Sequence, residues 1–343
     1  AYVLVRLMQR SFNTQPQLFQ YSSGFDHDAL HELDSVEAVL DWQKLEALMS
    51  DKVYASETGC PSYPLLTLLR AHLLGFWYKM SVKQLSNALA RDLLFRRFCR
   101  LELHDGVPSP RTLGRFLDEL VSFELWELLL GEVNRQLEEQ QIIMTECRIN
   151  IVDATPIEAL RSQPGKSKSK ANPGQDTRDP DADYHVKANS RGKKTSIYGY
   201  SLHVGCDEDG FIHRQSMTPG NAHDSTQLDT LLLGDEAALY ADPAFSSQAT
   251  RDKLETFGIQ DCVMRKGYRD NPISETNKER NAEISVVRSG GERPFAGIKK
   301  DFGLARTRFL GLKKNETFYG LAAIAANIKK AGKFLKQFGL RAS

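Results

Sequence analysis

The sequence predicts a mixed α/β domain preceded by an all-α domain, and two patterns predict this division. Through the first 140 residues, apolar residues recur at helical spacing and form no alternating runs. From Ile149 onward, short β-like runs mix with helical stretches in the order β, long loop, β, β, α, β, α, β, α. The 343 residues are enough for two or three domains, and we place the main boundary near residue 145.

The N-terminal region is expected to contain an arm and then several helices joined by short turns. Residues 1–25 form the arm, and residues 26–145 form the helical domain. Apolar spacing predicts a helix over 34–50 and a buried helix over 61–77, with Ser62 as its cap and Pro64 in its first turn. Another helix is predicted to begin at Ser81, and a short one covers the run LLFRRFCRL. Ser109 and Pro110 open a long helical stretch over 111–140.

The mixed domain is expected over 146–330, followed by a basic tail over 331–343. INIVDA predicts a buried strand ending at Asp153, and 161–183 predicts a flexible basic insert. Two β-like runs joined by Glu208-Asp209-Gly210 predict a hairpin. A helix over 224–233, the strand AALYADPAF, a helix over 246–257 and the strand IQDCVMR follow, and the last ninety residues are expected to be helical with breaks near 290 and 303.

Charge is distributed unevenly behind a formal net charge of +1. Residues 251–343 carry a net charge of +10, which leaves −9 for residues 1–250. Within residues 1–250, the segment 26–59 holds nine acidic side chains and two lysines, whereas the segment 161–194 holds nine basic and four acidic side chains. Such runs are as compatible with a solvated face as with a nucleic-acid surface. The acidic run could mimic DNA or contact a partner subunit.

Two further observations exclude classes of protein. No run of about 18 apolar residues occurs, so a membrane span is not expected. The five cysteines are odd in number, widely spaced and lack a CxxC pair, which argues against a disulfide framework or a zinc ribbon. We expect buried cysteines and a cytoplasmic protein.

Two aspartates occupy similar positions in the mixed domain. Asp153 and Asp242 each come at the end of a short apolar strand, and the strand pattern stops directly after each of them. Strands that end side by side in this way would bring the two carboxylates together at the rim of a sheet. Paired carboxylates repel, and a divalent cation such as Mg²⁺ or Mn²⁺ relieves the repulsion. A separate role for each as a turn former or helix cap stays open.

A third cluster lies near the C-terminus. Arg288, Glu292 and Lys299 are separated by four and seven residues, so on one helix they would share a face within about 40°. A solvent-exposed Arg–Glu pair is the alternative. Gly290 and Gly291 weaken a helix by about 1 kcal/mol each and could instead mark its start, with Ser289 as the cap.

Together, IVDATPIEA, ALYADPAFSS and RSGGERPFAGIKKDFG resemble the blocks of bacterial insertion-sequence DDE transposases. The third block is similar to the IS-four/IS-five-like branch, whose pattern reads Tyr-two-Arg-three-Glu-six-Lys. Arg288, Glu292 and Lys299 match the last three positions, whereas Ser285 stands at the tyrosine position. The helical front, PSPRTLGRF, KKTSIYGYSLHV, MTPGNAHDS and GLKKNETFYGLAAIAANIKK extend the resemblance over about residues 9–330.

The resemblance implies an RNase H-like catalytic domain with Asp153, Asp242 and Glu292 as the metal-binding triad. It implies two Mg²⁺ ions, with Mn²⁺ as a substitute, and phosphoryl transfer without a covalent enzyme intermediate. Double-stranded DNA would be the substrate, as element ends and as target, and Arg288 and Lys299 would contact its phosphates. A homodimer or larger synaptic complex, associated with the bacterial nucleoid, is expected on the same ground.

Several weaker candidates accompany this site. Lys193 and Lys194, with Tyr198 and Tyr200, could grip a DNA backbone, although alternating aromatics in a strand are usually core. In the helical front the candidates for DNA contact are Arg96, Arg97, Arg111 and Arg115. His223 is a possible neighbour of the site, next to Asp224 as a helix cap.

Three functions fit these patterns. The leading one is a transposase that binds the terminal inverted repeats of its insertion sequence, cleaves the ends and joins them to target DNA. The alternatives are a metal-dependent DNA nuclease without strand transfer and a domesticated, transposase-derived DNA-binding protein.

Overall fold

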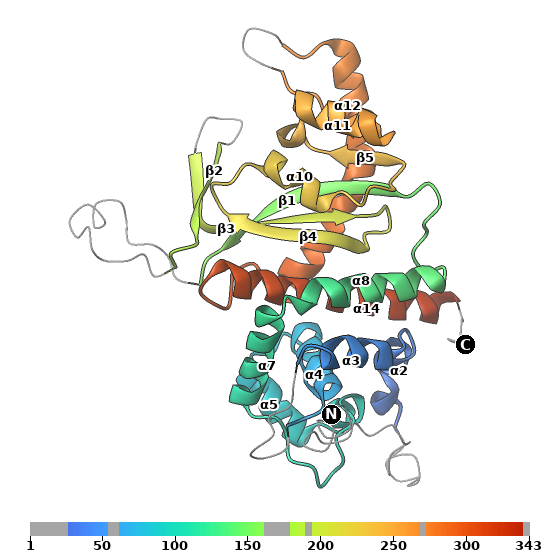
Figure 1. Ribbon diagram of the computed structural model, residues 1–343, viewed down its shortest axis with the longest axis vertical. Helices are drawn as coiled ribbons and strands as arrows, with labels where there is room; N and C mark the ends of the chain where they lie inside the picture. Colours follow the sequence, from blue (N-terminus) through green and yellow to red (C-terminus); the bar gives the residue numbers. More distant parts are fainter. Residues whose placement is uncertain (1–26, 54–61, 161–178, 189–193, 268–271, 339–343) are drawn as a thin grey trace, which may run out of the picture. The chain divides into compact units, whose positions relative to one another are not determined.

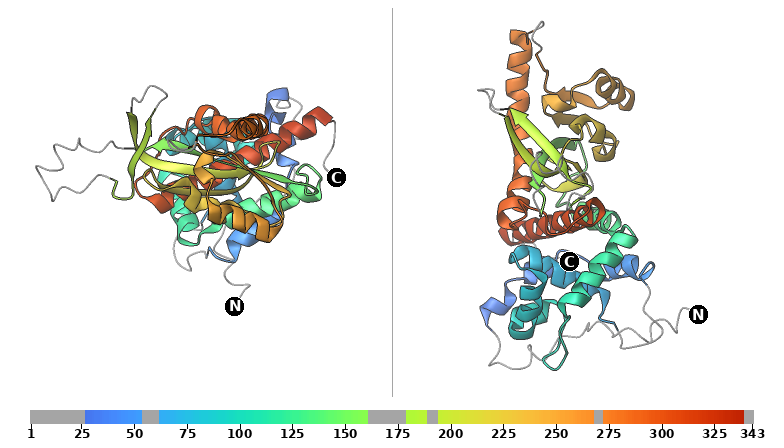
Figure 2. Two further views of the ribbon diagram at one scale, coloured as in Figure 1. Left: turned by 90° about the horizontal axis from the view of Figure 1, so that it is seen from above. Right: turned by 90° about the vertical axis from the view of Figure 1, so that its left-hand side faces the viewer.

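The computed structural model describes residues 27–53, 62–160, 179–188, 194–267 and 272–338, and it divides into two compact units (Figures 1 and 2). The helical unit comprises residues 1–143 and 320–343, and the sheet unit comprises residues 144–319. The domain limits expected from the sequence stay a prediction.

The helical unit contains several helices packed around one that is buried along its whole length. Its elements are η3 (Asp28–His31), α2 (Asp34–Glu37), α3 (Trp42–Ser50), α4 (Leu65–Trp77), α5 (Val82–Arg91), α6 (Leu93–Phe98), α7 (Pro110–Ser122), α8 (Leu125–Glu139) and the part of α14 (Leu312–Phe338) that follows Tyr319. Every residue of α4 is buried, as its apolar run predicts. The Trp77 indole donates a hydrogen bond to the Ala325 carbonyl of α14 (2.9 Å).

Helix boundaries in this unit follow side-chain caps. The predicted start at Ser81 is confirmed, because Ser81 and Gln84 form a reciprocal capping box at α5. The predicted helix over 34–50 is instead two helices, since Asp41 interrupts it and caps α3 through the Gln43 amide. The stretch over 111–140 also divides, because Glu124 adopts a left-handed conformation (φ 50°) between α7 and α8. Neither Ser62 nor Pro64 has the predicted role, as α4 begins at Leu65 with no side-chain cap.

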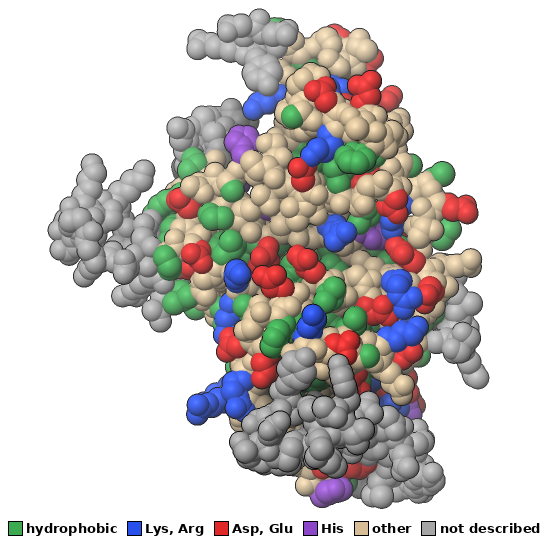
Figure 3. Space-filling view, in the orientation of Figure 1, with side chains coloured by type: hydrophobic (Ala, Val, Ile, Leu, Met, Phe, Trp, Pro, Cys, Tyr) green, Lys and Arg blue, Asp and Glu red, His purple; other side chains and the backbone are tan. Residues whose placement is uncertain are grey.

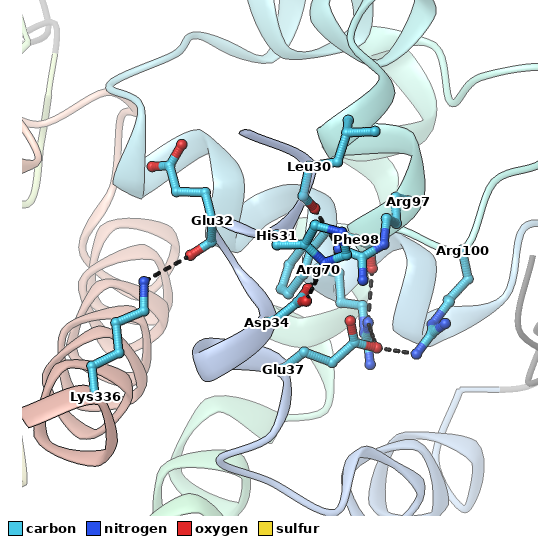
Figure 4. Close-up of polar contacts among 10 residues, drawn as sticks. All are labelled: Leu30, His31, Glu32, Asp34, Glu37, Arg70, Arg97, Phe98, Arg100 and Lys336. Atoms are coloured by element: carbon cyan, nitrogen blue, oxygen red, sulfur yellow. Dashed lines mark hydrogen bonds and ion pairs between the residues drawn. The ribbon is translucent and has the colours of Figure 1, made fainter. Parts of the chain in front are cut away.

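The acidic run is partly neutralised inside this unit (Figure 4). Glu37 accepts from both Arg70 and Arg100, and Asp34 pairs with Arg97 at 2.5 Å. Arg70 is fully buried and lies over the Trp42 ring, 4.3 Å from its centroid. Asp34 and Glu37 therefore fix the first helices against α4 and α6, which is a structural role that sequence reasoning did not anticipate.

The C-terminal end of the chain belongs to this helical packing. Residues 331–338, assigned from the sequence to a basic tail, form the last turns of α14, and Ala331 and Leu335 are buried. At Gly320 a Cβ would lie 2.4 Å from the Trp126 ring, so only glycine permits α8 and α14 to approach so closely. Figure 1 shows these two helices side by side.

The sheet unit confirms the predicted mixed sheet with helices on both faces. Its strands are β1 (Ile149–Glu158), β2 (Asp183–Ala188), β3 (Lys194–Cys206), β4 (Ile212–Pro219), β5 (Ala238–Ala241) and β6 (Gln260–Val263). The order is β2-β3-β1-β5-β6, and β4 also pairs with β3. Strands β2, β3 and β4 join by antiparallel pairing, whereas β5 and β6 run parallel to β1. The β3–β4 hairpin turns at Gly210 (φ 78°) as predicted, and β2 was not predicted.

The helical segments of this unit are η4 (Asp224–Gln227), α10 (Leu228–Leu231), η5 (Pro243–Phe245), α11 (Gln248–Phe257), α12 (Glu275–Arg288), η6 (Ser289–Gly291), α13 (Glu292–Ala296), η7 (Gly297–Asp301) and the first residues of α14. One sheet face packs Val152 and Leu239 against Leu231 and Leu254 of α10 and α11. The opposite face packs Ala238 and Cys262 against Ile284 of α12. Figure 2 shows these two helical layers on either side of the sheet.

The two residues that flank the segment 161–178, Leu160 and Asp179, are each fixed to the sheet unit. At the N-terminal end, the Leu160 amide donates to Thr307 Oγ1 (2.8 Å). At the other end, Asp179 is fully buried and accepts from the Tyr200 hydroxyl at 2.8 Å and from the Gly311 amide at 3.2 Å. Tyr200 is therefore part of the core, which is the usual place of alternating aromatic residues in a strand. Burial, with Asp179 beside the hydroxyl, raises the pKa of Tyr200. The segment itself, which holds most of the predicted basic insert, lies outside the described residues.

Among the helices of the described ranges, none is both long and apolar enough to cross a membrane. Cys99, Cys206 and Cys262 are buried as expected, whereas Cys147 is exposed.

Candidate active site

The candidate site is built on one face of β1. Side chains alternate between the two faces of a strand, so Ile151, Asp153 and Thr155 point to the same side. Val152 points to the opposite face of the strand and packs into the core with residues of α10 and α11. Ile151, Asp153 and Thr155 therefore face the layer that contains α12, η6, α13 and η7.

Asp242 lies level with Asp153 on the neighbouring parallel strand. The last register pair of β1 and β5 is Val152 with Ala241, and each aspartate comes one residue later. Asp242 follows the end of β5 as predicted, and its side chain accepts from the Ala244 amide (2.8 Å) to cap η5. The position of Asp153 within its strand was predicted wrongly. Instead of ending at Asp153, β1 continues to Glu158 because its pairing with β3 continues to Gly199.

Residues of the third block contact this face directly. Arg288, the last residue of α12, donates from Nη1 to Asp153 Oδ2 at 3.1 Å. Lys299, in the π-helical segment η7, donates from Nζ to Thr155 Oγ1 at 2.5 Å. Glu292 begins α13 between them. The sequence also allowed a solvent-exposed ion pair between Arg288 and Glu292. Arg288 instead pairs with Asp153.

Gly291 allows this close packing. A Cβ at Gly291 would lie 2.6 Å from Ile151 Cγ2, closer than side-chain atoms pack, so a larger residue would push η6 away from β1. The glycines predicted as a helix start thus mark the 3-10 turn η6, in which Ser289 forms no N-cap for α13. Three successive positions on one face of β1 each contact the segment 288–299.

The electrostatics of Asp153 reflect these neighbours. Burial raises the pKa of Asp153 above its ordinary value, because a desolvated carboxylate is less stable than the neutral acid. The Arg288 guanidinium and the Ala154 amide lower this pKa, whereas the nearby Asp242 and Glu292 carboxylates raise it. Burial and the two neighbouring carboxylates thus disfavour the charged form of Asp153, and a cation beside it favours that form.

The carboxylates of Asp153, Asp242 and Glu292 are the residues of this site that could hold a metal ion. Within the described part of the chain, no three His, Cys, Asp or Glu side chains lie close enough to hold one in the present arrangement. The donor set nevertheless fits a hard divalent cation, since it consists of carboxylate oxygens whose repulsion such an ion relieves. Arg288 supplies the positive charge beside Asp153 in its place.

Comparison with known families gives the classification. A family model described as "Transposase DDE domain" matches residues 146–328, more than half of the chain. The chain belongs to the DDE transposase family. A second model, "Transposase domain (DUF772)", matches residues 24–119 of the same transposase. The resemblance inferred from the sequence is thereby confirmed at the level of the family.

The transposase has the RNase H-like fold expected for its catalytic domain, with four strands (β1 to β4) joined by antiparallel pairing and two (β5 and β6) that run parallel to β1. Among solved structures it is similar to a pre-cleavage Mos1 transpososome at 13% identity, covering 78% of this chain and 97% of that one, with a TM-score of 0.20. A Mos1 strand transfer complex matches at 14% identity, covering 75% and 78%, with a TM-score of 0.19.

Two of the remaining predicted residues, His223 and Asp224, lie at the start of η4, which packs against η5, the turn that Asp242 caps. His223 is exposed and precedes η4; Asp224 is not the N-cap of η4, because His223 holds that position. The Asp224 carboxylate lies 3.7 Å from the buried His203 ring instead. Lys193 lies outside the described residues, and Lys194 is the first residue of β3.

In the helical unit, Arg111 and Arg115 are exposed one turn apart on α7. Arg96 is buried and donates to the Leu89 and Asp105 carbonyls, so it does not present its charge to DNA as considered from the sequence. Figure 3 shows acidic and basic side chains interspersed over the described residues of one face, without a wide area of one sign.

Sequence reasoning missed Thr155 as a member of this site. The motif IVDATPIEA contains it two residues after Asp153, and strand alternation alone would have placed both on one face. Its contact with Lys299 spans 144 positions, and no local pattern signals that contact.

Proposed function

We propose that this transposase cuts DNA at the terminal inverted repeats of its own insertion sequence and joins the freed ends to target DNA. The observation that carries the proposal is the meeting of three elements on one sheet face: Asp153 of β1, Asp242 after β5, and the segment bearing Glu292. The spacing of Arg288, Glu292 and Lys299 further supports membership of the IS-four/IS-five-like branch, with Ser285 as a departure from its tyrosine.

We assign Asp153, Asp242 and Glu292 as the ligands of divalent metal, with Mg²⁺ as the expected ion, Mn²⁺ as a substitute, and two ions per site. When bound, such ions stabilise the charge that develops on the attacking and leaving oxygens during phosphoryl transfer. The residues of the chain do the rest. The carboxylates would hold the ions beside the reacting phosphate, and Arg288 and Lys299 would bind neighbouring phosphates of the DNA backbone.

Other parts of the chain are proposed to hold the DNA. Arg111 and Arg115 form an exposed basic pair on α7, which suits contact with the phosphate backbone, and the matched segment 24–119 supports a DNA-binding or dimerisation role for residues 26–145. Lys193 and Lys194 would add non-specific backbone contacts. Because both element ends are handled together, the active species is proposed to be a dimer or a larger synaptic complex.

The deciding experiment incubates the protein with a plasmid that carries its gene and the flanking DNA, with and without Mg²⁺, and maps the ends produced. Metal-dependent cuts at two inverted termini, followed by joining to target DNA, support the proposal. Scattered nicking without joining supports a nuclease, and DNA binding without cutting supports a domesticated binding protein. Short inverted repeats flanked by a direct duplication around the gene independently favour the transposase.

Substitution of the triad makes the test specific to this site. Asp153→Asn, Asp242→Asn and Glu292→Gln should each lower the cleavage rate by about a thousandfold or more, since metal-ion stabilisation of the transition state is worth several kcal/mol. Glu158→Gln is the matched control, because Glu158 lies on the same strand but is exposed and pairs with Arg306. Normal cutting by any triad variant would remove that residue from the assignment.

A further inference from the structure

Strand β6 lies at the edge of the sheet, and its outer side is bonded to side chains rather than to another strand. The amides of Gln260 and of Met264, just beyond the strand, donate to β5. Alternate residues face opposite edges, so the backbone groups of Asp261, Val263 and Arg265 point away from the sheet. β6 ends the strand order, and no strand in the described ranges pairs with this outer side. Its backbone groups therefore need other partners.

Arg280 and Asn281 of α12 supply those partners. Arg280 donates from Nη2 to the Asp261 carbonyl (2.6 Å) and from Nη1 to the Val263 carbonyl (2.9 Å). The Asn281 side chain accepts from the Arg265 amide (2.8 Å) and donates to the Arg265 carbonyl (2.9 Å). A carboxamide contains both a donor and an acceptor, so Asn281 pairs with Arg265 as a residue of a neighbouring strand would. Two adjacent side chains thus bond α12 to the backbone along this edge.

The Asp261 carboxylate completes the arrangement. Its Oδ1 accepts from the Val263 amide (2.9 Å), and its Oδ2 accepts from Arg265 Nη2 (2.8 Å). The Arg280 guanidinium lies 3.7 Å from Oδ1, and its side chain is 29% exposed. Because Asp261 compensates the charge of Arg280, this arginine serves as an internal attachment between α12 and β6.

These bonds matter because α12 has little apolar packing of its own. The structure describes every residue of α12, and Ile284 is the only buried one among them. Ile284 packs against Ala238 and Cys262. A single apolar contact lets a helix pivot and slide, whereas directional hydrogen bonds fix its position along and about its axis. The position of α12 therefore depends on Arg280 and Asn281.

The far end of α12 leads directly into the third block. Arg288 is the last residue of α12 and comes seven residues after Asn281, which is about 10 Å along the helix axis at roughly 1.5 Å per residue. Glu292 follows after the 3-10 turn η6. A helix transmits a tilt over two turns, because its backbone is hydrogen-bonded throughout. The attachment at β6 thus determines where Arg288 meets Asp153.

We propose that Arg280 and Asn281 are positioning residues that fix α12 to the edge of β6 and thereby place Arg288 and Glu292 beside Asp153. This inference rests on the proposed function, because that function gives Glu292 its role at the metal. Arg280 and Asn281 touch neither metal nor DNA in this scheme, and they act only through the helix.

Hydrogen exchange, followed by mass spectrometry on the DNA-free protein, tests the attachment. Asn281→Leu keeps the size of the side chain and removes both hydrogen bonds. This variant and Arg280→Met should each speed amide exchange over 284–296 by about tenfold or more, because local opening no longer breaks these bonds. Exchange in α11, on the opposite face of the sheet, should stay within about twofold of the wild type. Lys278→Met is the matched control, since it removes a positive charge from the same helix at a residue that pairs with Glu275.

Cleavage at saturating DNA tests the consequence for the site. The substrate is the DNA fragment that carries the gene and its flanks, in single-turnover reactions with Mg²⁺. Asn281→Leu and Arg280→Met should each cut about 10- to 100-fold more slowly than the wild type, because Glu292 is no longer held in its productive position. A variant that has lost only stability keeps the wild-type rate per folded molecule, and thermal unfolding gives the folded fraction. Lys278→Met should cut at the wild-type rate.

Three results would overturn the proposal: wild-type exchange over 284–296 in both variants, equally faster exchange throughout the sheet unit, or wild-type cleavage by variants in which this segment exchanges faster. If the wild-type protein does not cut the DNA, the proposed function fails, and the exchange data still decide whether the attachment at β6 holds the third block. If the wild type cuts and both variants match it in both measurements, the transposase function stands and the positioning role falls.

Discussion

Arg288 and a divalent metal ion should compete for Asp153, and Arg288→Gln should therefore tighten metal binding in the absence of DNA. The Arg288–Asp153 pair is 3.1 Å long, and its side chains are only 20% and 16% exposed. At an effective dielectric constant of about 20, Coulomb's law gives an upper limit of about 5 kcal/mol for such a pair. Desolvation and the ordering of the side chains offset most of this, which leaves about 1–2 kcal/mol.

That energy opposes the entry of a metal ion, because the ion must replace or repel the guanidinium. Removing it should lower the Kd for Mg²⁺ or Mn²⁺ by about 5- to 30-fold, since 1.4 kcal/mol corresponds to a factor of ten. Isothermal titration calorimetry on the DNA-free protein measures this directly. Asp153→Asn identifies which binding event belongs to the site, because that variant should lose it.

Arg293→Gln is the control, as it makes the same change of charge five residues further along, at an exposed position. It should alter the metal Kd by less than about twofold, the range of screened surface charges. The reasoning is refuted if Arg288→Gln binds metal no more tightly than the wild type, or if Arg293→Gln shows the same gain.

Two further predictions concern stability. Gly291→Ala should destabilise the protein by about 1–3 kcal/mol, because its Cβ would meet Ile151 at 2.6 Å, whereas Gly297→Ala, with nothing within 4 Å, should stabilise by about 0.5–1 kcal/mol. Urea unfolding compares them, and equal stabilities would contradict the packing argument. Burial lowers the pKa of His72 from 6.5 to about 4, so the native state binds fewer protons than the unfolded state between these values. The stability that this residue contributes is complete above about pH 6.5 and falls by about 3 kcal/mol as the pH drops to 4; in His72→Gln the free energy of unfolding should change correspondingly less, and an unchanged pH dependence would show that His72 does not cause it.

The fold class and most elements could be predicted because their signals are local. Ser81 with Gln84, and the turn at Gly210, each depend on residues within a few positions of one another. The break at Glu124 could not be predicted, because a non-glycine residue in the left-handed region carries no sequence signal.

Pro156 explains why β1 was predicted too short. A proline normally ends a strand because it lacks an N–H donor. Here the Glu158 amide, which has the same parity, bonds to the Ala305 carbonyl rather than to β3, so the nitrogen of Pro156 also points away from β3. On that side β5 has already ended opposite Val152, so the missing donor breaks no ladder hydrogen bond.

In the candidate site, too, some features have local sequence signals and others depend on the tertiary fold. Asp153, Asp242 and Glu292 could be proposed from the sequence because short motifs surround each of them. The pairing of Arg288 with Asp153 joins residues 135 positions apart and depends on how η6 packs against β1. Contacts of this kind follow from the tertiary fold, and the sequence contains no periodic pattern that reports them.

The anchoring of both ends of segment 161–178 makes this position attractive for protein engineering. Thr307 secures Leu160 on one side, and Tyr200 and Gly311 secure Asp179 on the other, so each attachment includes hydrogen bonds to residues outside the segment. Loop-closure entropy rises only slowly with loop length, so a replacement of different length should cost little stability. A fluorescent reporter or an affinity handle placed here would label the catalytic half of the enzyme while leaving both chain termini unmodified.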